Sequence, residues 1–171
     1  MRFKRKLIFA FTGILMLGLC IPQRVVIPVQ NATPKDWNAN SFWFSPWGKS
    51  GVHKGIDIFA KRGIPVISST SDLVVYKGNI SMGGNMVAIL GPKWRIYYYA
   101  HLDDIHTKSF NWASRGETIG SVGNSGNAAG KPSHLHNSVL SLIPYPWRFS
   151  LQTQGYKKCF LWILQNNFKS K

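Results

Sequence analysis

Residues 85–102, NMVAILGPKWRIYYYAHL, hold two runs of apolar, β-branched and aromatic residues that are separated by Gly91 and Pro92. Runs of this kind, bounded by glycine and proline, are typical of short β-strands. The pattern continues on both sides of this stretch, with the runs IDIFA, IPVISS, LVVYKG, ETIGSV and HLHNSVL. The spacing predicts an all-β fold, with antiparallel strands arranged as one β-sandwich or barrel-like domain.

Length and composition favour one globular unit. The 171 residues are 44% hydrophobic, which suffices for a packed core and argues against wholesale disorder. No internal repeat or low-complexity linker marks a second domain. We expect an aromatic-rich lead-in over residues 25–50, the core over residues 51–142, and a C-terminal extension over residues 143–171 that packs on the core.

Basic residues at the N-terminus precede the uncharged run LIFAFTGILMLGLCIPQ. A positive segment followed by an apolar one is typical of a signal peptide, and the run matches this pattern better than a membrane span of about 20 residues. We predict that residues 1–24 are a signal peptide, or alternatively an uncleaved membrane anchor with its basic end inside the cell. In both cases the protein is exported, to the periplasm or cell envelope or into the medium.

The segments that flank the core leave alternatives open. The lead-in contains WNANSFWFSPWG over residues 37–48, whose aromatic side chains either cover one end of the sheet or in part line a groove. The tail contains KKCFLWILQNN, which fits a last strand or a short helix. Its Cys159 has only Cys20 of the export segment as a possible partner, so we expect no disulfide framework and interpret Cys159 as a buried apolar filler.

Positive charge is the other strong feature of the composition. The chain has 21 Lys and Arg against 6 Asp and Glu, a formal net charge of +15. An exported cation of this kind should be attracted to anionic polymers, although a solvated basic surface is the simpler alternative. We expect no nucleic-acid partner, because export removes the chain from nucleic acid and no zinc-finger spacing or basic helix occurs. The glycine-rich GSVGNSGNAAGKPS is no phosphate loop, because Ser125 and Pro132 replace required residues.

Two of the five histidines, His134 and His136, stand one residue apart in the run HLHNSVL. Alternate residues of a strand share a face, so both rings should emerge on the same side. Taken alone, the pair fits either two polar residues of an exposed edge strand or two groups with a shared partner. Further ligand candidates decide between these interpretations.

A second histidine motif supplies such candidates. His53 and Asp57 are four residues apart in HKGID, where an extended backbone would place them on one face and Gly55 between them would leave room for an ion. With a histidine of the H-x-H pair, the set becomes two imidazoles and one carboxylate. Catalytic zinc uses three such ligands and keeps a fourth position for water, whereas structural zinc mostly uses cysteines that this chain lacks.

These residues give the chain a resemblance to a known family. The order of HKGID, YYYAHL and HLH resembles the lysostaphin-type zinc metallopeptidases, the LytM or M23 peptidase family. The resemblance extends from about Gly51 to Leu140 and includes GGNMVAIL and SRGETIGSVGNSGNAAG. It implies a β domain with a substrate groove that hydrolyses peptide bonds of peptidoglycan, with the stem-peptide cross-link favoured over a glycine bridge.

The resemblance also implies a role for each site residue. His53, Asp57 and His136 correspond to the Zn²⁺ ligands, while His101 and His134 correspond to residues that assist a zinc-activated water. Strand geometry alone does not make this division, because both histidines of an H-x-H can bind one zinc. The glutamate base of an H-E-x-x-H motif is absent from the sequence, so imidazole is expected to move the proton.

One departure from the family pattern keeps a rival function open. The family commonly continues H-x-H with an aromatic residue and glutamate, whereas Asn137 and Ser138 follow here. Changed residues around a metal site can reduce metal affinity or activity by about 10- to 100-fold. The rival is a catalytically impaired wall-binding module that activates other peptidoglycan hydrolases.

Overall fold

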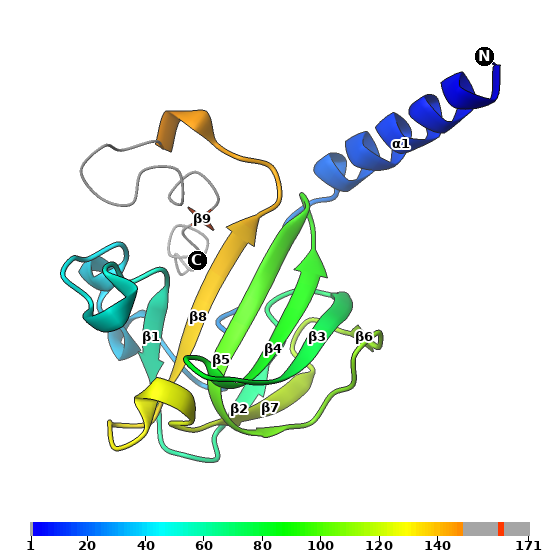
Figure 1. Ribbon diagram of the computed structural model, residues 1–171. Coiled ribbons are helices and arrows are strands. Elements are labelled where there is room, and N and C mark those ends of the chain that lie inside the picture. Colours follow the sequence, from blue (N-terminus) through cyan, green and yellow to red (C-terminus); the bar gives the residue numbers. More distant parts are fainter. Residues whose placement is uncertain (1, 149–160, 163–171) are drawn as a thin grey trace.

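The computed structural model describes residues 2–148 and 161–162, which form one α-helix and nine β-strands (Figure 1). Helix α1 spans Arg2–Cys20, and no helix of the described residues is both long and apolar enough to cross a membrane. The strands are β1 (Ile56–Phe59), β2 (Pro65–Ile67), β3 (Asp72–Ile80), β4 (Gly84–Gly91), β5 (Arg95–Ile105), β6 (Trp112–Ala113), β7 (Thr118–Val122), β8 (His134–Ser141) and β9 (Leu161–Trp162). Short 3₁₀ turns are η1 (Pro34–Asp36), η2 (Ala39–Ser41), η3 (Gly48–Ser50), η4 (Gly126–Ala128) and η5 (Pro146–Arg148).

The strands form one antiparallel sheet. Its main path has the order β1-β8-β5-β4-β3-β6, while β7 joins β2 to the far end of β5 and β9 pairs with β8. In Figure 1, β2 and β7 lie at the lower ends of β4 and β5, behind the main sheet. The prediction of an all-β antiparallel domain is confirmed, and all seven β-rich runs of the sequence contain strands.

A β-bulge in β5 shapes the sheet beside the site. Across β4 and β5, Val87 faces Tyr99 and Asn85 faces Leu102, so β5 carries one residue more than its partner between these pairs. His101 lies in this bulge with a φ of 63°. Before the bulge β5 pairs with β8, and after it β5 pairs with β7. Bulges bend a strand and redirect side chains, and here the bulge lies where β5 exchanges one partner for another.

The two faces of the sheet differ in character. Tyr97, Tyr99 and Leu135 are fully buried in the main core. The other strands contribute Ile56 and Ile58 of β1, Val74 of β3, Val87 and Ile89 of β4, and Ile119 and Val122 of β7. The residues that alternate with them, Tyr98 and Ala100 on β5, line a pocket on the opposite face. Strand alternation therefore separates a packing face from a site face, as expected for a sheet with one solvated side.

The described segments that flank the core on both sides contact the sheet. The lead-in pairs Val29 with Val66 and packs Trp37 and Phe42 against the core. At the other end, β9 pairs with β8, so Leu161–Trp162 of the predicted tail form a strand. Residues 149–160 and 163–171, including Cys159, lie outside the described residues, and the limits predicted for the lead-in, core and extension stay predictions.

Candidate active site

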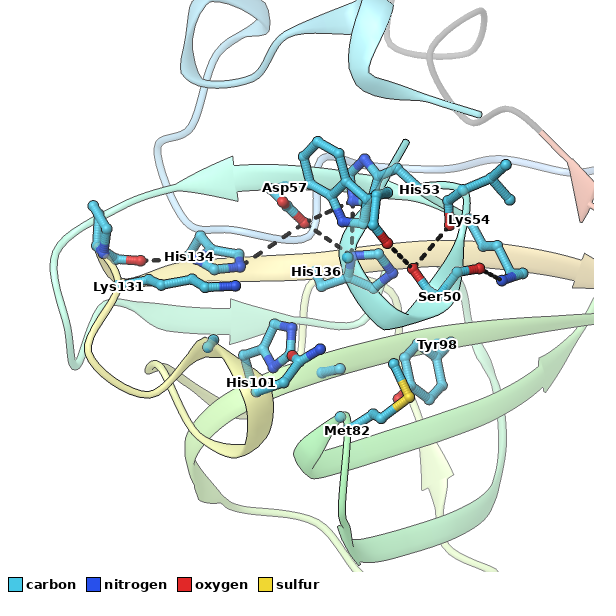
Figure 2. A pocket seen from close by; sticks show the side chains of 18 of the residues that line it. Ser50, His53, Lys54, Asp57, Met82, Tyr98, His101, Lys131, His134 and His136 are labelled. Atoms are coloured by element: carbon cyan, nitrogen blue, oxygen red, sulfur yellow. Dashed lines mark hydrogen bonds and ion pairs between the residues drawn. The ribbon is translucent and has the colours of Figure 1, made fainter. Parts of the chain in front are cut away.

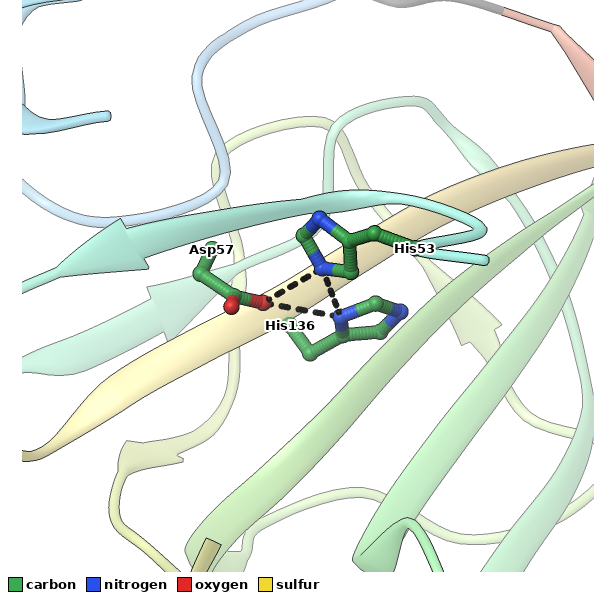
Figure 3. A group of neighbouring side chains, drawn as sticks. All are labelled: His53, Asp57 and His136. Atoms are coloured by element: carbon green, nitrogen blue, oxygen red, sulfur yellow. Dashed lines mark hydrogen bonds and ion pairs between the residues drawn. The ribbon is translucent and has the colours of Figure 1, made fainter. Parts of the chain in front are cut away.

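Three predicted ligands converge at the junction of β1 and β8. His53 precedes β1, Asp57 lies on β1, and the Cα atoms of Asp57 and His136 are direct partners across the two strands. Asp57 Oδ1 is 2.8 Å from His136 Nδ1 and 3.1 Å from His53 Nε2, and the two ring nitrogens are 3.2 Å apart. Figure 3 shows the three side chains pointing at one another.

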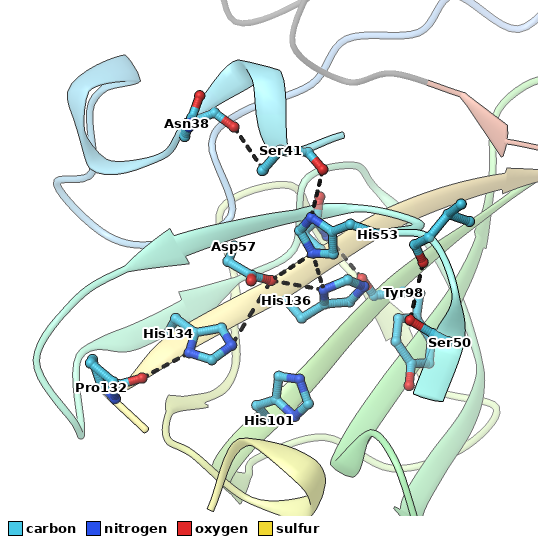
Figure 4. A network of polar contacts seen from close by, with 12 residues as sticks. Asn38, Ser41, Ser50, His53, Asp57, Tyr98, His101, Pro132, His134 and His136 are labelled. Carbon is cyan, nitrogen blue, oxygen red and sulfur yellow. Dashed lines mark hydrogen bonds and ion pairs between the residues drawn. The ribbon is translucent and has the colours of Figure 1, made fainter. Parts of the chain in front are cut away.

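The second nitrogen of His53 is held by the lead-in. Its Nδ1–H donates to the backbone oxygen of Ser41 at 2.9 Å, because a carbonyl can only accept (Figure 4). This bond fixes the tautomer and leaves a lone pair on Nε2, directed at Asp57 and His136. Trp47 stacks on the His53 ring with a centroid distance of 4.2 Å. The ring is thus fixed in position and tautomer.

The electrostatics of Asp57 suit a cation ligand. Burial by itself favours the neutral acid, but a proton on the facing nitrogen of His136 or His53 outweighs it through hydrogen bonding and charge, and holds the pKa of Asp57 far below its usual range. The carboxylate is therefore ionised at neutral pH. Burial lowers the pKa of His136, so its ring favours the neutral form that can bind a metal.

The donor set fits zinc. Ligand atoms at about 2.0–2.2 Å from a tetrahedral zinc lie about 3.4 Å apart, close to the 2.8–3.2 Å separations found here. One carboxylate and two imidazoles leave a fourth position for water or substrate. A lone pair on His53 Nε2 facing a carboxylate oxygen would be repulsive without a cation or proton between them. The three residues can thus hold Zn²⁺ with no change of fold.

His101 and His134 lie beside this cluster with a common hydrogen-bond pattern. Their Nδ1 atoms donate to the backbone oxygens of Ser125 at 2.9 Å and Pro132 at 2.8 Å, so in the neutral tautomers the lone pair is on Nε2. The ring centroids of His101 and His134 are 5.1 Å apart, and His134 Nε2 is 3.9 Å from Asp57 Oδ1. Burial and the neighbouring His136 and His134 lower the pKa of His101 to about 4, so the ring is neutral at neutral pH.

The predictions about the H-x-H strand can be compared with this geometry. His134 and His136 both line the pocket while Leu135 between them is buried in the core, which confirms that the two histidines share a face. His101 lines the same pocket as these two histidines. Which ring binds metal and which assists stays a prediction.

Gly55 has a role that differs from the expected one. A Cβ built on Gly55 would lie 2.5 Å from the backbone oxygen of Asn137 and 2.8 Å from His136 Nε2. The space beside Gly55 is therefore filled by β8 and the His136 ring rather than by an ion. Only glycine permits this close approach of the two segments.

We expect Gly55→Ala to weaken both zinc binding and folding, because the methyl group would push the His136 ring out of the cluster. The free energy of unfolding should fall by about 1–3 kcal/mol, as measured by thermal and denaturant unfolding, with zinc affinity followed by competition with a chelator. Gly78→Ala on β3 is the control, since its new Cβ would meet only the exposed Tyr76 side chain. Equal effects of the two variants would contradict this role of Gly55.

The pocket contains residues that sequence reasoning did not assign to it. It has a volume of about 870 Å³ and opens between η3, the turn before β4, and the segment from η4 to β8 (Figure 2). Trp47 lines the pocket, whereas Trp37 and Phe42 pack on the core. The aromatic side chains of the lead-in therefore do both things that the sequence left open: some cover the sheet and one lines a groove. Tyr98 and Lys131 also line it. The alternation of YYYAHL could have identified Tyr98, but no local signal placed Lys131.

Comparisons with known proteins agree with the fold and the motifs. The sequence matches Peptidase family M23 over residues 51–142. The L-Ala–D-Glu endopeptidase of Bacillus subtilis is 34% identical over 140 residues, which cover 72% of this chain and 43% of the relative. The murein hydrolase activator NlpD of Escherichia coli is 31% identical over 90 residues, which cover 52% of this chain and 23% of the relative. The chain spans less than half the length of these curated relatives.

Solved structures show the same fold. The catalytic domain of lysostaphin from Staphylococcus simulans superposes with a TM-score of 0.60 at 22% identity, covering 76% of this chain and 90% of that domain. A zinc-containing peptidase from Vibrio cholerae superposes with a TM-score of 0.52 at 26% identity, covering 67% of this chain and 37% of that protein. The family match spans more than half of the chain and includes every residue of the His–Asp–His cluster. The chain belongs to peptidase family M23.

Proposed function

We propose that the protein is an exported zinc-dependent endopeptidase that hydrolyses peptide bonds of peptidoglycan in the cell envelope, with the stem-peptide cross-link as the favoured bond. The observation that carries this proposal is the convergence of His53, Asp57 and His136 within 3.2 Å of one another, on a pocket that two further histidines line. Membership of family M23 and the similarity to an endopeptidase support it.

In this proposal His53, Asp57 and His136 hold Zn²⁺. Zinc bound there would supply a Lewis acid that lowers the pKa of a water molecule toward about 7 and polarises the scissile carbonyl. His101 and His134 each present Nε2 to the pocket, because their Nδ1 protons are donated to Ser125 and Pro132. One of them accepts the water proton, and once protonated it donates to the developing oxyanion or the leaving amine.

Tyr98 is a further donor within the pocket. Its ring meets the His136 ring edge-on at a centroid distance of 6.3 Å. Burial raises the pKa of its hydroxyl, which therefore stays protonated over the working pH range. A neutral phenol beside the metal cluster can donate a hydrogen bond to a carbonyl oxygen without changing the charge of the site.

A second candidate function is an activator of other wall hydrolases that lacks activity of its own. The similarity to NlpD favours it. The hydrogen bonding of the His136 ring is a second argument for it. Metal-binding histidines usually donate their second ring N–H to an acceptor, yet His136 Nε2 makes no hydrogen bond to the described residues. Asn137 and Ser138, which replace the usual aromatic and glutamate, supply no acceptor to this ring within the described part of the chain.

Metal removal separates the two candidates. The purified protein should contain about one zinc per chain and release soluble fragments from peptidoglycan. Dialysis against a chelator should abolish release, and one equivalent of zinc should restore it. Fragment masses then identify the bond. A native protein that binds peptidoglycan but holds no zinc and releases nothing would contradict the endopeptidase proposal and support the activator.

A further inference from the structure

We propose that the pocket selects a peptide with a carboxylate beside the scissile bond, and that Lys131 is the specificity-determining residue that binds this carboxylate. The inference rests on the proposed function, because the zinc cluster defines where the scissile bond lies. It goes beyond that function by naming the chemistry of the neighbouring residue. Four observations carry it: the placement of Lys131, its lack of an ion-pair partner, the charge of the pocket, and the position of His134.

The backbone around Lys131 directs its side chain into the pocket. Lys131 lies between η4 and β8, where its N–H donates to the Ala128 oxygen at 3.0 Å and its own carbonyl accepts from Asn124 Nδ2 at 3.3 Å. Figure 2 shows the side chain extended toward the middle of the pocket, running in the same direction as the His134 ring. Both residues line the pocket, so the ammonium group reaches the region that adjoins the metal cluster.

The ammonium group of Lys131 has no carboxylate partner within the described part of the protein. Its side chain is exposed and forms no ion pair with any described carboxylate. The nearest acidic lining residue, Asp57, is already engaged by His53 and His136. By contrast, the exposed Arg62 pairs with Asp103 outside the pocket. A cation that is directed into a pocket without a partner is available to a ligand.

The whole pocket is positively biased. Its lining includes Lys54 as well as Lys131, while Asp57 is the only carboxylate among the lining residues. Zinc would add two further positive charges next to that carboxylate. A cleft lined by one sign of charge raises the local concentration of ligands of the opposite sign. A peptide with an acidic residue at the scissile bond fits this pocket better than a neutral one.

The geometry also indicates where the carboxylate lies. His134 Nε2 is 3.9 Å from Asp57 Oδ1, so His134 is the imidazole that adjoins the cluster on the side from which Lys131 enters. A group bound by Lys131 therefore lies on the His134 side of the polarised carbonyl, where the residue next to the scissile bond would sit. The bond named for the Bacillus subtilis relative, L-Ala–D-Glu, has an acidic residue at such a position. A glycine bridge offers no side-chain carboxylate there.

The test uses two synthetic peptides that differ only in a carboxylate or a carboxamide on the residue flanking the cleaved bond. We expect the zinc-loaded full-length protein to prefer the carboxylate peptide by about tenfold in kcat/KM. Lys131→Gln should reduce this preference to about twofold, through KM rather than kcat, because the contact is made equally in the ground and transition states. Lys108→Gln, which removes an exposed lysine outside the pocket, should leave the preference unchanged.

A binding measurement keeps the inference separate from the proposed function. Calorimetric titration of chelator-treated protein with the same two peptides should show a similar preference, lost in Lys131→Gln and weakened by salt. If binding discriminates while no peptide or peptidoglycan is cleaved, the inference stands and the endopeptidase proposal fails. Two outcomes would contradict the inference. Either the wild-type protein cleaves or binds both peptides equally, or Lys131→Gln retains the full preference for the carboxylate peptide.

Discussion

Replacement of His136 by alanine is expected to reduce zinc affinity by at least about 100-fold and fragment release by more than about 1,000-fold. The imidazole lies on β8 directly opposite Asp57 and supplies one of three ligand atoms within 3.2 Å of one another. Its loss leaves one imidazole and one carboxylate, which is too few ligands to hold catalytic zinc at micromolar metal. Zinc content by mass spectrometry and fragment release from peptidoglycan would measure both effects.

His106→Ala is the matched control for this experiment. His106 is an exposed histidine on the same domain and does not line the pocket, so the variant loses an imidazole without touching the cluster. Its zinc content and activity should equal those of the wild type. Thermal unfolding of both variants in chelator would verify that each is folded. Retention of stoichiometric zinc and full activity by His136→Ala would remove His136 from the metal site.

His101→Asn is expected to lower kcat by about 100- to 10,000-fold while zinc content stays at the wild-type value. The ring is neutral at neutral pH, donates from Nδ1 to the Ser125 oxygen, and lies 5.8 Å from the His136 ring between centroids. Its Nε2 is thus available as a proton acceptor beside the cluster but is not one of the three converging ligand atoms. Loss of the ring should affect the proton transfer and not metal binding.

Asparagine is chosen because of the backbone at this position. The φ of His101 is 63°, in the left-handed region that asparagine adopts more readily than alanine. The substitution thus removes the imidazole while the bulge in β5 remains. Kinetics and zinc content would be measured on the same preparation. A decrease in zinc content parallel to the activity would place His101 among the metal ligands, and a change below about threefold would remove it from catalysis.

Most of the strands could be predicted from the sequence, because strand formation depends on local features. Glycine, proline and runs of β-branched residues mark where a strand can begin and end, and alternation assigns each residue to a face. This is why His134 and His136 were correctly placed on one face of β8 without knowledge of the partner strands. The order of the strands in the sheet was not predicted, because pairing partners depend on contacts between distant segments.

The site could be predicted only in part. The spacing of HKGID and HLH identified the residues that now form the His–Asp–His cluster, although β1 begins at Ile56 and leaves His53 outside the strand. The role of Gly55 was misjudged, because the sequence does not show that the Asn137 carbonyl and the His136 ring approach it across β1 and β8. No local pattern indicated that Ser41, twelve residues before His53, accepts its Nδ1 proton.

The sequence by itself determined the chemical groups of this protein and the strands that carry them, because ligand types and side-chain alternation are properties of short segments. Only the tertiary structure decided how these groups act together. The bulge that contains His101 lies where β5, which pairs with β4 on one side, exchanges β8 for β7 on the other. The carbonyls of Ser41, Ser125 and Pro132 fix three histidine tautomers, and two of these carbonyls are 12 and 24 residues from their histidines. Such contacts depend on chain closure over long distances, which no local pattern encodes.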